Sequence, residues 1–334
     1  MVTRASVWSL DAATYVPHSL HTDRCAWVEK NCYVDVLIEI LHARHLDPMA
    51  VMPFTLAIDF EGDQWTFFKP PPGDLTELYG VEIHELNVWR PLLDHATRHV
   101  GEGKVLLTEA DAYFLPDTVG TDYGRQHTKT TIGIETVDRD AMRLGYFHNA
   151  SYHTLGGADF AGLFGLSAPS DPSRLPLFAE IMRFDRVRAA SRFDLVGRSV
   201  ELLIHHLQRR PGTNPVERFK ASFDSDVGTF ASDGLAYHSY AFATLRQLGA
   251  SFELTSLYLS WLDHEFGDPP IVQAAETFAE ISSLAKALVL KGARAVATKR
   301  PADFAPMLDR MVDRWERGMD LLERRFGARV GASG

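Results

Sequence analysis

Two side chains in the first half of the chain, a thiol and an imidazole, could together transfer an acyl group. Cys32 lies at the start of a helix that the spacing of apolar residues predicts over 32–45. The unpaired N–H groups of a helix start stabilise anions, which favours a reactive thiolate. His127 precedes a predicted strand over 131–137 and could act as base and then as acid toward that thiol. We therefore predict nucleophilic catalysis by Cys32 and His127.

A thiol–imidazole pair also needs a third group that fixes the tautomer of the ring. Residues 131–137 and 143–152 predict a hairpin, which returns His148 and Asn149 toward His127. Either of these two side chains could orient the ring. Asp111 ends a predicted strand over 104–111, where it could position His127 or a substrate amine, or simply be solvated.

Other residues are candidates for binding substrate. The backbone N–H of Cys32, together with the Asn31 side chain, would hold the oxyanion of a tetrahedral intermediate. Trp65 would supply apolar surface to a pocket wall, and Lys129 would either meet a phosphate or be solvated. The chain contains no zinc-binding helix motif, P-loop, dinucleotide fingerprint or nucleophile elbow. We predict no bound metal or cofactor.

The elements that must position these residues divide the chain into two halves. Residues 1–165 mix helical and strand patterns, including a strand candidate over 54–60. Residues 166–334 are almost wholly helical in pattern, over 175–208 and 235–326. The sequence therefore predicts an α+β domain with an antiparallel sheet over 1–165 and an all-helical domain over 166–334.

Composition and charge narrow the class of protein. The chain has 334 residues, of which 46% are hydrophobic and 23% charged, as in ordinary globular proteins. Its net charge of −10 argues against nucleic-acid binding. Five arginines in the second half would form an exposed helix face or a docking face for an acidic carrier protein. These residues are Arg183, Arg186, Arg188, Arg192 and Arg198.

The cysteine count and hydropathy bear on the cellular compartment. Cys25 and Cys32 are the only cysteines and make no disulfide framework. The N-terminus has no long apolar core, and no run of about 18 apolar residues follows. We expect a cytoplasmic protein that does not enter a membrane.

The order of these residues resembles that of papain-like folds, with cysteine at a helix start, histidine at a strand start and a polar group on the next strand. One stretch of the chain is also similar to the N-terminal domain of the butirosin-biosynthesis acyltransferase family. Its sequence is VLLTEADAYFLPDTVGTDYGRQHTKTTIGI. That family often has Asp where this chain has His148 or Asn149. The resemblance implies acyl or aminoacyl transfer from a carrier-protein thioester, presented on a phosphopantetheine arm, to a small amine.

The whole chain also resembles the bacterial domain of unknown function 1839 family. The shared motifs include NCYVDVLIEILHARHLDP, LPDTVGTDYGRQHTKTTIGI and RLGYFHNASY. This resemblance implies no established activity. Three functions stay open: an acyltransferase that forms an acyl-enzyme on Cys32, a cysteine hydrolase at the same site, and a non-catalytic protein that binds a carrier protein or a peptide.

Overall fold

The structure is a computed structural model that describes residues 4–22, 24–166, 177–230, 233–300 and 302–327. The chain forms two compact units, and each draws on more than one stretch of sequence. The first comprises Met1–Thr22, Asn31–Asp47 and Leu75–Ala189, and the second comprises Asp23–Lys30, Pro48–Asp74 and Ala190–Gly334.

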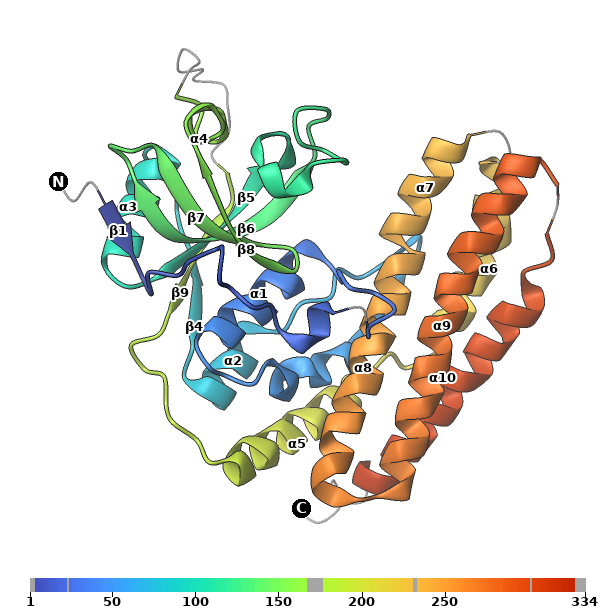
Figure 1. Cartoon of the computed structure of the whole chain (residues 1–334). Coiled ribbons are helices and arrows are strands. Elements are labelled where there is room, and N and C mark those ends of the chain that lie inside the picture. Colours follow the sequence, from blue (N-terminus) through green and yellow to red (C-terminus); the bar gives the residue numbers. More distant parts are fainter. Residues whose placement is uncertain (1–3, 23, 167–176, 231–232, 301, 328–334) are drawn as a thin grey trace. The chain divides into compact units, whose positions relative to one another are not determined.

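The first unit is built on an antiparallel sheet, which has seven strands among the described residues (Figure 1). In spatial order they are β4 (Glu82–Glu85), β9 (Ala179–Arg183), β5 (Val105–Asp111), β6 (Lys129–Asp138), β7 (Arg143–His148) and β8 (Ser151–Gly156). Strand β1 (Arg4–Ser6) pairs with the end of β6, beyond the last residue that pairs with β5. This arrangement makes β6 the central strand of the site described below.

Helices cover both faces of this sheet. Helix α1 (Cys32–Ala43) packs on one face, where Gly133 of β6 allows a close approach. A Cβ atom at that position would lie 2.9 Å from Cδ1 of Ile40. Helices α3 (Leu92–Gly101) and α4 (Ala158–Leu163) bury their apolar residues on the other face, against Ile132 and Ile134. The two faces of β6 therefore meet different helices.

Short elements connect these layers. The 3₁₀ turns η3 (Ala112–Phe114) and η4 (Pro116–Thr118) lie in the connection from β5 to β6. The 3₁₀ turn η1 (Ser19–His21) precedes α1, and α2 (Pro72–Tyr79) precedes β4.

The second unit is mainly helical. Its helices are α5 (Arg192–Gln208), α6 (Pro215–Thr229), α7 (Gly234–Ala243), α8 (Leu245–Phe266), α9 (Pro269–Thr298) and α10 (Ala305–Phe326). Gly267 ends α8 in the left-handed conformation, with φ of 58°, and Pro269 begins α9. The unit also contains η2 (Pro48–Ala57) and the hairpin of β2 (Phe60–Glu61) and β3 (Gln64–Trp65).

The observed fold is mixed α and β, with an antiparallel sheet in the first half and helices in the second. The expected helix from Cys32, the strand ending at Asp111 and the hairpin after His127 are confirmed. Two expectations are wrong. Residues 54–60 lie largely in the 3₁₀ segment η2, and residues 179–183 form strand β9 rather than the beginning of a helix. In the part of the chain that is described, no helix is long and apolar enough to cross a membrane.

Candidate functional site

Cys32 occupies the first position of α1, and the residue before it caps the helix. The Asn31 side-chain oxygen accepts hydrogen bonds from the N–H groups of Tyr33 (3.1 Å) and Val34 (2.9 Å). The Asn31 oxygen is thereby committed to the helix start. The Cys32 N–H makes no hydrogen bond among the described residues, and it could donate to a developing oxyanion.

The Cys32 thiol faces strand β6. It donates a hydrogen bond to Oγ1 of Thr131 at 3.5 Å, and the residue is partly exposed. Thr131 pairs across the ladder with Glu109 of β5. Because side chains directly opposite each other in an antiparallel pair share a face, Glu109 lies on the Cys32 side of the sheet.

His127 and Asp111 form a close pair just before β6 begins. Nδ1 of His127 lies 2.6 Å from Oδ2 of Asp111, and the imidazole stacks on Tyr113 with ring centroids 4.5 Å apart. These contacts fix one ring nitrogen and the plane of the ring, which leaves Nε2 available to a partner. Of the two roles considered for Asp111, the structure has the one in which it positions His127.

Along the chain, Lys129 lies between His127 and Thr131, the residue of β6 that contacts Cys32. Its ammonium donates to Oε1 of Glu109 at 2.8 Å, and Lys129 pairs across the ladder with Asp111. The hydrogen bond to Glu109, together with the charge of that carboxylate, raises the pKa of Lys129. The ladder thus places Thr131, Glu109, Lys129 and Asp111 on the face of the sheet that α1 covers, and His127 bonds to Asp111 at its edge.

His148 lies on the opposite face. Its Nε2 is 2.9 Å from Oγ1 of Thr130, which follows Lys129 and so points away from Cys32. Its Nδ1 is 2.5 Å from Oδ2 of Asp117, and the side chain is buried. Burial alone would raise the pKa of Asp117, but hydrogen bonds from His148 and Tyr146 and the charge of His148 lower it. His148 is therefore paired with Asp117, not with His127.

Asn149 belongs to the tight turn between β7 and β8. It follows His148, which pairs with Ser151, and its φ is 46°. Asparagine tolerates this left-handed conformation better than most residues, which accounts for its presence in the turn.

The structure does not join the thiol to the imidazole. The partner of Cys32 is Thr131, four residues along the chain from His127, and four extended residues span about 13 Å. Within the described residues no hydrogen bond links Cys32 to His127. The site is thus two adjacent pairs on one face, a thiol with a hydroxyl and an imidazole with a carboxylate.

Comparison with known families accounts for nearly all of the chain. The model of the DUF1839 N-terminal domain matches residues 16–184, and that of the DUF1839 C-terminal domain matches residues 193–324. The chain belongs to the DUF1839 family. No curated protein matches it. The thiol–hydroxyl and imidazole–carboxylate pairs both lie in the DUF1839 N-terminal domain.

Trp65 lies in the second unit, although its sequence position falls within the DUF1839 N-terminal domain. It is buried in an aromatic cluster with Phe60 and Phe219, with ring centroids 5.5 and 5.7 Å away. Its role in the structure is to fill the core of that unit.

The five arginines predicted to share a helix face do not do so. Arg183 ends strand β9, Arg186 and Arg188 follow it, and α5 begins only at Arg192. Arg183 and Arg186 pair with Glu82, and Arg192 pairs with Glu265. The expectation of a single helix face is wrong because β9 replaces the first part of the expected helix.

Two residues of the site were missed in the sequence. Thr131 and Glu109 are half-buried polar residues of β6 and β5. Alternation supplied the signal: Glu109 is two residues before Asp111, and Thr131 is four residues after His127, so each shares a face with its neighbour. In the described part of the chain, no group of three or more His, Cys, Asp or Glu side chains could hold a metal ion.

Proposed function

We propose that this protein is a cysteine-dependent acyltransferase that moves an acyl or aminoacyl group from a carrier-protein thioester to a small amine. The observation that carries the proposal is a shared face of the β5–β6 ladder, which presents the Cys32 thiol at a helix start and the oriented His127–Asp111 pair. A nucleophile, a base and a group that orients the base are the parts that covalent acyl transfer requires.

In the first step the Cys32 sulfur bonds to the thioester carbonyl carbon while His127 holds the thiol proton. The carbon–sulfur bond to the carrier breaks, and the carrier thiol leaves with that proton. In the second step the amine attacks the acyl-enzyme and loses a proton to His127, and the Cys32 sulfur departs and is reprotonated. The Cys32 N–H stabilises the oxyanion in both steps, an effect worth about 3–4 kcal/mol for one such donor.

The proposal requires His127 to approach Cys32 when substrate binds. A separation of about 13 Å along the chain exceeds the usual lengthening of catalytic hydrogen bonds before substrate binds, so the approach would require the segment before β6 to move. Lys129 lies between the two groups, and its exposed ammonium would exchange Glu109 for a substrate phosphate such as that of a phosphopantetheine arm.

The papain-like assignment and the relationship to the butirosin-biosynthesis acyltransferases belong to the same proposal. Both are supported by a helix-start cysteine packed on an antiparallel sheet, with histidine at the start of a strand. Both cysteines are free thiols, which agrees with a reducing cytoplasm. Arg186 and Arg188, outside any helix, remain candidates for docking an acidic carrier protein.

Hydrolysis at the same site is a second candidate, because of the exposure of His127. Its side chain is 70% exposed, so water has access to the base. An enzyme that transfers acyl groups must instead keep water from the acyl-enzyme. The two functions therefore differ in whether turnover depends on the amine.

The test is to incubate the protein with acetyl- and aminoacyl-carrier protein and to locate any added mass. We expect the acyl mass on Cys32, absent in Cys32→Ser and retained in Cys25→Ser, which changes the other thiol. Turnover that needs an added amine supports the transferase, and turnover in water alone supports the hydrolase. Absence of any adduct, with Cys32 alkylated by iodoacetamide no faster than free cysteine, would contradict both and favour a binding protein.

A further inference from the structure

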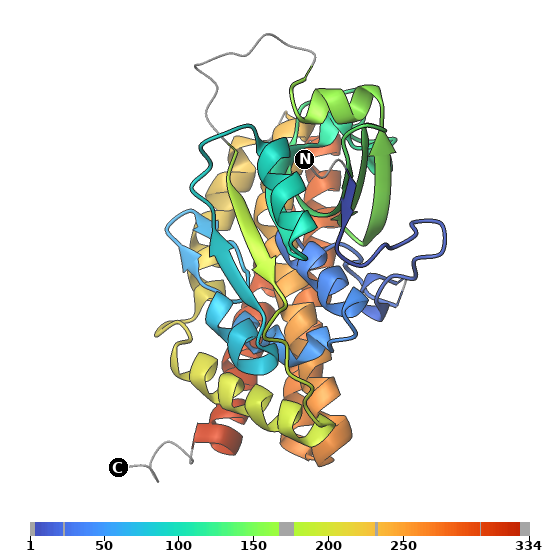
Figure 2. The same ribbon diagram turned by 90° about the vertical axis from the view of Figure 1, so that its left-hand side faces the viewer.

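A hollow of about 480 Å³ lies against helix α3 in the first unit, away from the Cys32 face. Helix α3, the teal helix near the N label in Figure 2, supplies most of its wall. The charged side chains that line it are Arg90, Arg98, Arg139, Asp94 and Glu102. Arg139 comes from the turn between β6 and β7, so the hollow is framed by separate elements.

The cations around this hollow exceed the carboxylates that balance them. Arg139 pairs with Asp94 at 2.5 Å. Glu102 is shared, because both Arg98 and Lys104 bind it. Three arginines that line the hollow therefore face two carboxylates, one of which is also bound by Lys104, in a chain whose net charge is −10.

Arg90 is the cation that lacks a carboxylate. In the described part of the chain its guanidinium makes no ion pair, and its buried Nε–H has no acceptor. Because Arg90 lines the hollow without a carboxylate partner, its guanidinium fork can donate to an anion there. Arg90 also stacks over Trp89, 5.3 Å from the ring centroid, which restricts its position.

Nearby cations also lower the pKa values of two histidines on α3. Burial first, and then the charge of Arg90, lowers the pKa of His95. Burial first, and then the charge of Lys104, lowers the pKa of His99. Both imidazoles are therefore neutral at neutral pH and do not add to the charge that an anion would meet.

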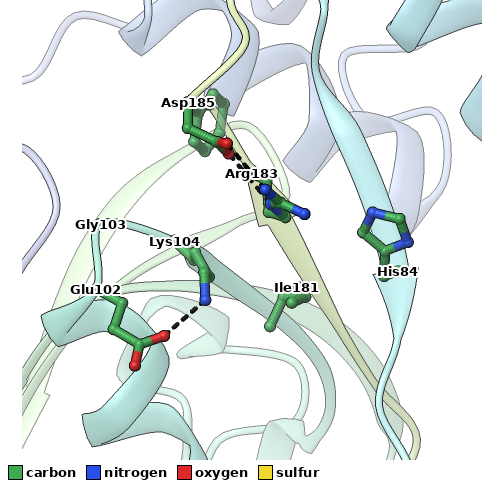
Figure 3. Close-up of a pocket in the computed structure, with 8 residues that line it drawn as sticks. His84, Glu102, Gly103, Lys104, Ile181, Arg183 and Asp185 are labelled. Atoms are coloured by element: carbon green, nitrogen blue, oxygen red, sulfur yellow. Dashed lines mark hydrogen bonds and ion pairs between the residues drawn. The ribbon is translucent and has the colours of Figure 1, made fainter.

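A second hollow in the same unit makes the contrast clear. It measures about 590 Å³ and is also lined by cations, Lys104 and Arg183. Figure 3 shows Lys104 bonded to Glu102 and Arg183 bonded to Asp185, and Arg183 also pairs with Glu82. Each cation that lines this second hollow has a carboxylate partner, so the second hollow lacks the unpaired guanidinium of the first.

We propose that the hollow against α3 binds the phosphate group of a small molecule through Arg90, with Arg98 and Arg139 beside it. A phosphate monoester carries about −1.5 to −2 charges at neutral pH, and the lining carries more cations than carboxylates. The guanidinium fork fits phosphate oxygens in a bidentate manner. The volume leaves room for the rest of a small ligand beside the phosphate. This site is independent of Cys32 and of the proposed acyl transfer.

The test uses pyrophosphate as the probe and isothermal titration calorimetry as the measurement, with citrate as a carboxylate of comparable charge. We expect saturable binding of pyrophosphate that Arg90→Gln weakens at least tenfold and Arg139→Gln weakens less. The matched control is Arg183→Gln, which changes the paired arginine of the second hollow and should leave binding unchanged. Trp89, 79% exposed beside Arg90, should report the same binding by fluorescence.

Three outcomes would overturn the proposal. The first is no saturable binding of pyrophosphate to the unaltered protein. The second is equal weakening by Arg90→Gln and Arg183→Gln, which would show general attraction of anions. The third is citrate binding as tight as that of pyrophosphate and equally dependent on Arg90, which would assign the site to carboxylates.

Discussion

Alternation along β6 decides which side chains can act together. Lys129 and Thr131 point toward α1, whereas Thr130 between them points toward α3 and α4. A polar residue whose side chain points to the opposite face of the sheet cannot contribute to the site, even when it is adjacent in sequence. His148 shows this, because its contact with Thr130 separates it from Cys32 by the thickness of the sheet.

Asp111 is the residue that gives His127 its orientation, so replacing its carboxylate should impair acyl transfer. We expect Asp111→Asn to lower the rate of Cys32 acylation by a carrier-protein thioester about 10²- to 10⁴-fold, with little change in thioester affinity, because the imidazole loses its fixed tautomer. Rapid-quench measurement of the acyl-enzyme gives both quantities.

The control for this prediction is Asp138→Asn, at the end of β6, the strand that pairs with that of Asp111. It should leave the acylation rate unchanged. Equal rates for Asp111→Asn and the unaltered protein would mean that the His127–Asp111 pair has no part in the chemistry.

At the scale of elements, the start of α1 depends on one side chain. Asn31 caps two N–H groups, so Asn31→Ala should lower the free energy of unfolding by about 0.5–2 kcal/mol. Asn31→Asp should restore most of it, because aspartate is an equally good cap. Urea unfolding followed by circular dichroism measures both variants. Failure of Asn31→Asp to restore stability would contradict a capping role.

The close contact between α1 and β6 depends on Gly133, which has no side chain. A methyl group at Gly133 would lie 2.9 Å from Cδ1 of Ile40 and 3.1 Å from Cγ1 of Val36, so α1 must shift to admit it. We expect Gly133→Ala to cost about 1–3 kcal/mol of unfolding free energy. The shift should also change the rate at which iodoacetamide alkylates Cys32, as followed by mass spectrometry.

The control is Gly197→Ala, in helix α5, where a Cβ atom would meet open space. Alanine there should be neutral or stabilising by up to about 1 kcal/mol. Equal stability of both variants would show that α1 and β6 tolerate a wider separation.

The elements predicted correctly are those whose local sequence pattern matches the structure that they form. Asn31 followed by apolar residues at helical spacing marks α1, and the run ending at Asp111 marks β5. Strand β9 gave no such signal, because four of its five residues are buried and central strands lose the alternation of exposed and buried positions. The same strand ends at Arg183, which is why an arginine-rich helix was expected there.

The sequence named three residues of the candidate site but not how they pair. Cys32, His127 and Asp111 share a face of the sheet, yet the choice of Asp111 over His148 as the partner of His127 depends on strand register. Register is set by how whole strands pair, which no single motif reports.

At the scale of the whole molecule, stability depends on buried charges as well as on apolar cores. Glu135 is fully buried and accepts hydrogen bonds from Ser6, Trp8, Ser9 and Tyr152, which fixes the N-terminal strand to the sheet. One carboxylate can accept several such bonds at once. The stability of the fold should therefore depend on pH through a few identifiable groups.

His21 predicts the direction in which the unfolding free energy changes with pH. Its ring is fully buried between two carboxylates of α1, with Nε2 3.0 Å from Oδ1 of Asp35 and Nδ1 bonded to Glu39. Burial alone would lower the pKa of His21, but the hydrogen bonds and charges of Asp35 and Glu39 raise it above its usual 6.5. The stabilisation is then complete below about pH 6.5 and is lost as the pH rises through the raised value.

We therefore expect the unfolding free energy to fall as the pH rises above about 6.5, and His21→Gln to remove most of that fall. His18→Gln is the matched control: burial, and then the charge of His42, lowers the pKa of His18 to about 4, so it is already neutral in this range. Urea unfolding at each pH gives the slopes, and the NMR titration of the His21 ring in the unaltered protein gives its pKa directly, even if His21→Gln folds poorly. A His21 ring that is already neutral at pH 6 would contradict the paired-carboxylate account, because an imidazole held between two carboxylates must keep its proton well above that pH.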